Sequence, residues 1–179
     1  MPYQLYADAK LSADRKTVEI NFAAKNEIFG DKAAGAPFNA YAGNGNIIRN
    51  YSVAAGDQLI DKWNLAEFPN QQYHLKVNGP NGFYREFRAN ASDPAVDIAV
   101  EYVRKKNNKL TGNIEVQIRN FDSTSHAIEV VDNAYKKASL RKTVEKTGSG
   151  KKTSCILFFD LKKKVLAGFT ILPLQNFRQ

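Results

Sequence analysis

The chain has 179 residues, of which 43% are hydrophobic and 25% are charged, and this composition indicates a globular protein of one domain or two small ones and argues against a disordered one. No apolar run approaches the ~20 residues that a membrane-spanning helix requires, and the first residues lack the basic, apolar and small-residue succession of a signal peptide. The single cysteine, Cys155, excludes an internal disulfide, and its apolar surroundings predict a buried small side chain rather than a nucleophile.

Charge is distributed unevenly along the chain. Residues 1–92 contain 10 Lys and Arg against 9 Asp and Glu, whereas residues 93–179 contain 16 against 9. The basic second half either faces an anionic partner or exposes a solvated basic surface. Nucleic acid is the least favoured partner, because single-stranded nucleic-acid binders interleave charge with aromatic side chains, and here the aromatics cluster in the first half.

Alternation of apolar and polar side chains, the signature of β-strands, recurs from the first half to the second. It is clearest at residues 18–22, 73–77 and 114–118. Clusters of turn-forming residues separate the strand-like segments, at residues 43–46, 55–57, 78–82, 106–109 and 148–150. This pattern predicts an all-β chain of the immunoglobulin/fibronectin-like sandwich type, with helices of a single turn at most.

Several of these segments occur twice. The matched segments are residues 17–22 with 113–118, residues 38–41 with 128–135, and residues 51–56 with 141–148. A polar stretch at residues 90–94 separates the two sets, and Pro94 cannot donate to a strand ladder. We therefore predict two tandem small antiparallel β-sandwich modules, residues 1–92 and 93–179.

Residues that could support catalysis or bind a metal are scattered. His74 and His126 have no second His, Cys or carboxylate at metal-ligand spacing. Asp57 and Asp61 flank residues 58–60 and could meet on a loop, but calcium loops need denser oxygen ligands. Phosphate-binding glycine loops, a G-x-S-x-G elbow and a Ser-His-Asp set are also missing from the sequence. The residues predict no catalytic, metal-binding or cofactor-binding site.

The segment at residues 83–87 combines aromatic and charged side chains. Alternation places Arg85 on the same face as Phe83 and Phe87, so its guanidinium must reach a carboxylate or backbone carbonyl to avoid an unpaired buried charge. Tyr84 faces the other way and is the candidate for an outward stacking platform. Core packing between strands explains the other aromatics.

Lysine clusters distinguish the second half. Lysine at strand ends and turns also discourages edge-to-edge association, so these clusters have a structural explanation as well as a functional one. An anionic membrane surface requires only the charge. The candidate lipid- or anion-facing residues are Lys136, Lys137, Arg141, Lys142, Lys151 and Lys152.

A family resemblance is carried by residues 37–41, 49–56 and 73–88, together with Trp63. These segments are similar to the C-terminal repeat domain of bacterial phospholipases C that act on phosphatidylcholine. The most specific part is the G-P-N-G-F-x-R-E-F run at residues 79–87. Its expected structural residues are Gly79, Pro80, Gly82, Phe83, Arg85 and Phe87. Residues 130–135 look like the matching strand of a second copy, whose ending departs from the family pattern from about residue 161 onward.

The resemblance implies a longer parent enzyme, an acid phosphatase-like phosphoric diester hydrolase that releases phosphocholine from phosphatidylcholine or sphingomyelin. It places the metal-binding and catalytic residues in a large N-terminal domain of the same polypeptide, so none is carried over to this chain. The chain is then expected to be a non-catalytic accessory region of a secreted or periplasmic enzyme, stabilising the catalytic domain or docking it on a phospholipid surface. The alternative is a carbohydrate- or protein-binding β-sandwich module of an extracellular protein.

Overall fold

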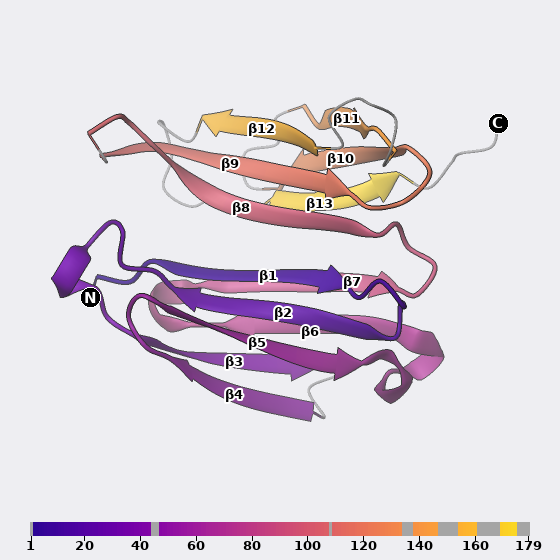
Figure 1. Cartoon of the computed structure of the whole chain (residues 1–179), viewed down its shortest axis with the longest axis horizontal. Coiled ribbons are helices and arrows are strands. Elements are labelled where there is room, and N and C mark those ends of the chain that lie inside the picture. The colour runs from indigo at the N-terminus through magenta and orange to yellow at the C-terminus, as the bar shows by residue number, and fades with distance from the viewer. Residues whose placement is uncertain are drawn as a thin grey trace. The chain divides into compact units, whose positions relative to one another are not determined.

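The computed structural model describes residues 2–43, 47–107, 109–133, 138–146, 154–160 and 169–174. Within these residues the chain forms thirteen β-strands, and its only helices are four short 3-10 turns. The prediction of an all-β chain with single-turn helices is confirmed. The chain divides into two compact units, Met1–Asp93 and Pro94–Gln179 (Figure 1).

The first unit is built from two antiparallel sheets. The three-stranded sheet has the order β1-β2-β5 and consists of β1 (Leu5–Leu11), β2 (Thr17–Ala24) and β5 (Asp57–Asn64). The four-stranded sheet has the order β4-β3-β6-β7 and consists of β3 (Ala36–Ala42), β4 (Ile47–Val53), β6 (Gln72–Asn78) and β7 (Tyr84–Asn90). The 3-10 turns are η1 (Gly30–Lys32), η2 (Leu65–Glu67), η3 (Pro69–Gln71) and η4 (Pro80–Gly82). Figure 1 shows one sheet lying over the other, the arrangement of a β-sandwich.

The core of the first unit lies between these sheets. Val18, Ile20 and Phe22 of β2 are fully buried, because a strand turns every second side chain to the same face. The ring of Phe22 packs 5.4 Å from that of Phe38 on the opposite sheet. Trp63, in register with Val18, is also fully buried. Large apolar side chains from both sheets therefore hold the unit together.

The described strands of the second unit follow the same order as those of the first. One sheet, β12-β9-β8, consists of β8 (Val96–Arg104), β9 (Leu110–Asn120) and β12 (Ser154–Asp160). The other, β11-β10-β13, consists of β10 (His126–Asp132), β11 (Leu140–Val144) and β13 (Phe169–Leu174). The similar segments 17–22 and 113–118 lie on the central strands β2 and β9. This recurrence supports the interpretation of the sequence as a repeat.

Asp57 and Asp61 lie on β5, where they pair with Ala24 and Ile20 of β2, so the loop that the sequence allowed for them does not form. The paired segment extends through the polar residues because β5 is an edge strand with one face in water. The atypical ending predicted from residue 161 lies largely outside the described residues, apart from β13.

Among the described residues, no helix has the length and apolar character needed to cross a membrane.

Candidate functional site

Both histidines of the chain lie on strands, His74 on β6 and His126 on β10. Nε2 of His74 lies 2.6 Å from Oε1 of Glu86, and Nε2 of His126 lies 2.8 Å from Oδ2 of Asp122. Each histidine therefore meets one carboxylate, in a different unit. No group of three or more His, Cys, Asp and Glu side chains in the described residues is arranged to hold a metal ion.

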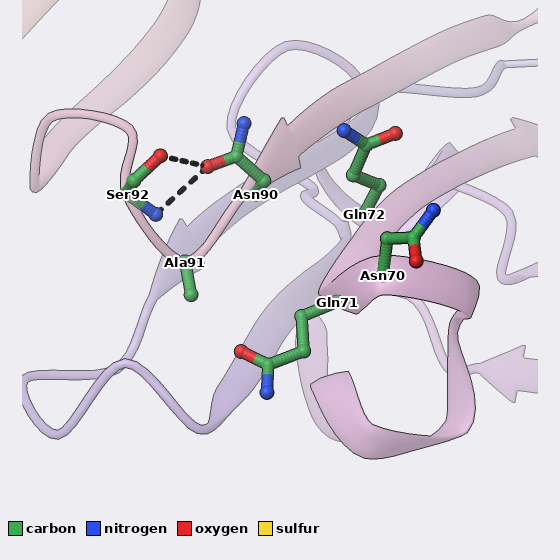
Figure 2. Close-up of a pocket in the computed structure, with 6 residues that line it drawn as sticks. All are labelled: Asn70, Gln71, Gln72, Asn90, Ala91 and Ser92. Atoms are coloured by element: carbon green, nitrogen blue, oxygen red, sulfur yellow. Dashed lines mark hydrogen bonds between the residues drawn. The ribbon is translucent and has the colours of Figure 1, made fainter.

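The first unit has an open, shallow pocket of about 320 Å³ (Figure 2). It lies where β6 begins and β7 ends, since Gln72 and Asn90 are register partners on these strands. Its lining residues are Asn70, Gln71, Gln72, Asn90, Ala91 and Ser92. Sequence reasoning missed this site. Its signal was the run of adjacent amides at residues 70–72, but only the pairing of β6 with β7 brings the second set of residues against them.

Hydrogen bonds fix one wall of the pocket. Oδ1 of Asn90 accepts from the backbone N–H of Ser92 at 2.8 Å and also from its hydroxyl. The backbone N–H of Asn90 donates to Oδ2 of Asp93 at 2.7 Å. Nη1 of Arg15 donates to the carbonyls of Ala91 and Asp93, both at 2.9 Å. These bonds set the path of the backbone after β7.

The glycine-rich family motif forms the turn between β6 and β7. The backbone N–H of Gly79 donates to the carbonyl of Phe83 at 2.9 Å, and that of Phe83 donates to the carbonyl of Pro80 at 3.1 Å. The turn presents the ring of Phe83 edge-on to Phe38, with ring centroids 5.7 Å apart. Phe87 also packs against the core, partly buried. The geometry supports a structural role for this motif.

Arg85 shares the face of Phe83 and Phe87, as the alternation predicts. Its guanidinium lies 4.9 Å from the Phe83 ring centroid, and Nη1 donates to the Tyr84 carbonyl at 3.0 Å. Arg85 thus reaches a backbone carbonyl, in agreement with the expectation from the sequence. The aliphatic part of Arg85 and its guanidinium cover the ring of Phe83.

Replacing Gly82 by Ala is expected to lower the free energy of unfolding of the first unit by about 1 kcal/mol. Gly82 has φ of +74°, a left-handed conformation that L side chains rarely adopt, while the space around its Cα is open. Urea unfolding followed by the fluorescence of Trp63, the single tryptophan, measures the effect. Gly82→Asn is the control, since Asn tolerates the left-handed region, and an equal loss in both variants would contradict the argument.

A charged cluster ties the edge strands β4 and β5 together. Nη1 of Arg49 lies 2.7 Å from Oδ2 of Asp61, and the hydroxyl of Tyr51 donates to the same oxygen at 2.6 Å. The Arg49 guanidinium also stacks over Trp63, 3.8 Å from the ring centroid. Burial would raise the pKa of Asp61, but the hydrogen bonds from Tyr51 and Arg49 outweigh it and lower the pKa. Because β4 and β5 belong to different sheets, this cluster closes one side of the sandwich.

Tyr84 lies on the outer face of the four-stranded sheet, 44% exposed. Its hydroxyl donates to Oε2 of Glu86 at 2.8 Å. Partial burial and this hydrogen bond raise the pKa of Tyr84 to about 12. This aromatic side chain therefore points outward, as the alternation predicts.

The structure describes two of the six candidate lipid-facing residues. Arg141 and Lys142 are neighbours on β11, so they point to opposite faces. Nε of Arg141 donates to Oε1 of Glu129 at 3.0 Å across the strand pair, while Lys142 is in register with Ile128. The other four, Lys136, Lys137, Lys151 and Lys152, lie outside the described residues. A shared cationic surface therefore stays a prediction.

Comparison with known proteins gives the same family as the motif at residues 79–87. The family described as "Bacterial phospholipase C, C-terminal domain" matches residues 1–90. The non-hemolytic phospholipase C of Pseudomonas aeruginosa is 29% identical over 150 residues, which cover 79% of this chain and 20% of the relative. This chain thus spans about a fifth of that relative's length, and the predicted resemblance is confirmed. The chain belongs to the family of bacterial phospholipase C C-terminal domains.

Proposed function

We propose that this chain is a non-catalytic accessory region of a phospholipase C that hydrolyses phosphatidylcholine. The observation that carries the proposal is the construction of the first unit, the part that the family matches. Its interior is an apolar sandwich core, and its charged side chains tie strands together, as Arg49 and Asp61 do, or pair on a sheet face, as His74 and Glu86 do. Such pairs stabilise a module and do not form a reaction centre.

Within the parent enzyme, the two modules at residues 1–92 and 93–179 would support the N-terminal catalytic domain of the same polypeptide, outside the cytoplasm. The excess of Lys and Arg in residues 93–179 favours docking on an anionic lipid surface over a purely stabilising role. Each basic residue near such a surface contributes about 1 kcal/mol, so a few together suffice for measurable binding.

We expect the chain to co-sediment with phosphatidylcholine vesicles that contain phosphatidylserine, and not with vesicles of phosphatidylcholine alone. High salt should release it, because the Debye length falls from about 10 Å at 0.1 M to about 3 Å at 1 M ionic strength. Phosphocholine release, measured in the same samples, should stay at the level of protein-free vesicles. Hydrolysis would contradict the non-catalytic role, and failure to bind any vesicle would leave only the stabilising role.

Reversing the charge of one lysine pair tests which half of the chain contacts the vesicle. Replacing Lys151 and Lys152 by Glu should weaken co-sedimentation with the phosphatidylserine vesicles at least about tenfold, since it reverses two cations. The control replaces Lys10 and Lys16 of the first half by Glu, an identical change in net charge. Equal losses in both variants would show that net charge alone, rather than the second half, determines binding.

A further inference from the structure

The pocket where β6 begins and β7 ends is lined by polar side chains for which the accessory role has no use. We propose that it binds a neutral polyhydroxylated ligand of the size of one sugar ring, through the amides of Asn70, Gln71, Gln72 and Asn90 (Figure 2). This site is independent of lipid docking and of the phospholipase activity of the parent enzyme.

The lining of the pocket selects the class of ligand. Four carboxamides and one hydroxyl line it, with Ala91 as its one apolar side chain, and the Ser92 hydroxyl already donates to Oδ1 of Asn90. A carboxamide offers two N–H donors and an acceptor oxygen, which complement hydroxyl groups that both donate and accept. Phosphate groups favour Arg or Lys, a choline headgroup favours aromatic faces, and an acyl chain favours an apolar lining. The lining residues supply none of these three.

The amides of the pocket are available to a ligand. In the described part of the chain, the side chains of Asn70, Gln71 and Gln72 make no hydrogen bond to protein, and Nδ2 of Asn90 makes none either. Amides with a structural role in this protein look different. Asn120 is buried and its Nδ2 donates to three backbone carbonyls, those of Thr124, Val144 and Glu145.

The pocket is also held in shape before a ligand arrives. Asn70 and Gln71 both adopt left-handed φ angles, 54° and 55°, in the 3-10 turn that leads into β6. The backbone N–H of Gln71 donates to the Phe68 carbonyl at 3.1 Å, and Arg15 holds the opposite wall through the Ala91 carbonyl. The backbone on both sides of the pocket is therefore fixed before a ligand binds, whereas the exposed amide side chains become ordered on binding, which agrees with weak affinity.

The volume of about 320 Å³ lies at the small end of ligand pockets. Because the site is open and its hydrogen bonds replace bonds to water, we expect a dissociation constant in the millimolar range for a single sugar. Such weak binding is measurable by NMR, and side-chain amide signals report directly on the residues concerned.

The experiment titrates the ¹⁵N-labelled full chain with glucose, galactose and N-acetylglucosamine, each followed in ¹⁵N–¹H correlation spectra. Phosphocholine and inorganic phosphate are titrated separately. The expected result is a saturable shift of the side-chain amide signals of residues 70–72 and 90 with at least one sugar, and no saturable shift of these signals with phosphocholine or phosphate. No saturable shift with any of the three sugars would overturn the proposal, and so would saturation by phosphocholine or phosphate at the same signals.

A variant series links the shifts to the pocket. Gln72→Met preserves the length of the side chain and removes its polar atoms, so the dissociation constant should rise about fivefold, as expected for the loss of one neutral hydrogen bond. Asn50→Ala, an exposed amide on β4 outside the pocket, is the matched control and should leave the constant unchanged. Equal effects in the two variants would overturn the assignment of the site. Asn70→Gly, which removes the amide and tolerates the left-handed φ of this position, provides a second variant should Gln72→Met perturb the backbone spectrum.

Discussion

Replacing Phe38 by Ala is expected to lower the free energy of unfolding of the first unit by about 3–5 kcal/mol, the typical cost of truncating a core phenylalanine. Phe38 is 0% exposed and joins the two sheets of the sandwich. Its ring packs 5.4 Å from Phe22 of the facing sheet and 5.7 Å from Phe83, the aromatic residue of the family motif. The variant leaves a cavity that rigid strands on both sides cannot fill.

Trp63 makes this effect measurable in the full chain. It is the single tryptophan and is fully buried in the first unit, so its fluorescence during urea unfolding reports on that unit alone. Ile48→Ala is the control, because Ile48 is an apolar side chain that is 53% exposed and should cost less than about 0.5 kcal/mol. A Phe38→Ala variant as stable as the Ile48→Ala variant would contradict the described core.

Replacing Asp61 by Asn is expected to cost about 2 kcal/mol at pH 7, the range for hydrogen bonds to a charged group. The Asp61 and Arg49 side chains are only 28% and 31% exposed, so water compensates incompletely for the lost carboxylate. Asn can still accept the hydrogen bond of the Tyr51 hydroxyl. The stabilisation that is lost is therefore mainly that of the ion pair, because the Arg49 guanidinium is left beside a neutral partner.

The pH dependence of this variant tests the electrostatic origin of the effect. The folded protein lowers the pKa of Asp61, so the unfolded state binds the proton more tightly. The stabilisation is therefore fully present above the unfolded pKa of about 4 and is lost as pH falls through the lower folded pKa. Urea unfolding at pH 7 and pH 3 should show the difference between wild type and Asp61→Asn shrinking. Asp57→Asn, on the same strand, serves as control, and a difference independent of pH would contradict the ion pair.

Periodicity along the chain determined the strands of this protein. The alternation at residues 18–22, 73–77 and 114–118 corresponds to β2, β6 and β9, and the described turn-forming residues 55–56 and 79–82 fall between strands. This signal is local, because the direction of a side chain on a strand depends only on its position in the sequence. The direction of Tyr84 and the face shared by Arg85 and Phe87 were predictable for the same reason.

Family membership also came from the sequence itself, since the run at residues 79–87 is a set of residue identities at fixed spacing. The structural role of this run could not be predicted from the sequence. Only the structure shows that the turn at Gly82 delivers the ring of Phe83 to Phe38, a residue more than 40 positions earlier in the chain.

The tertiary structure alone decided which polar side chains meet. Alternation gives the face of Arg49 and of Asp61 but not the sandwich edge at which their strands approach, and the sequence also allowed a loop at Asp61. The pocket likewise exists only because the register of β6 with β7 sets Gln72 opposite Asn90. The sequence by itself thus determined strand positions, fold class and family, which depend on local pattern and residue identity. The charged cluster and the pocket depend on pairings between distant strands, which are set by the packing of the whole core.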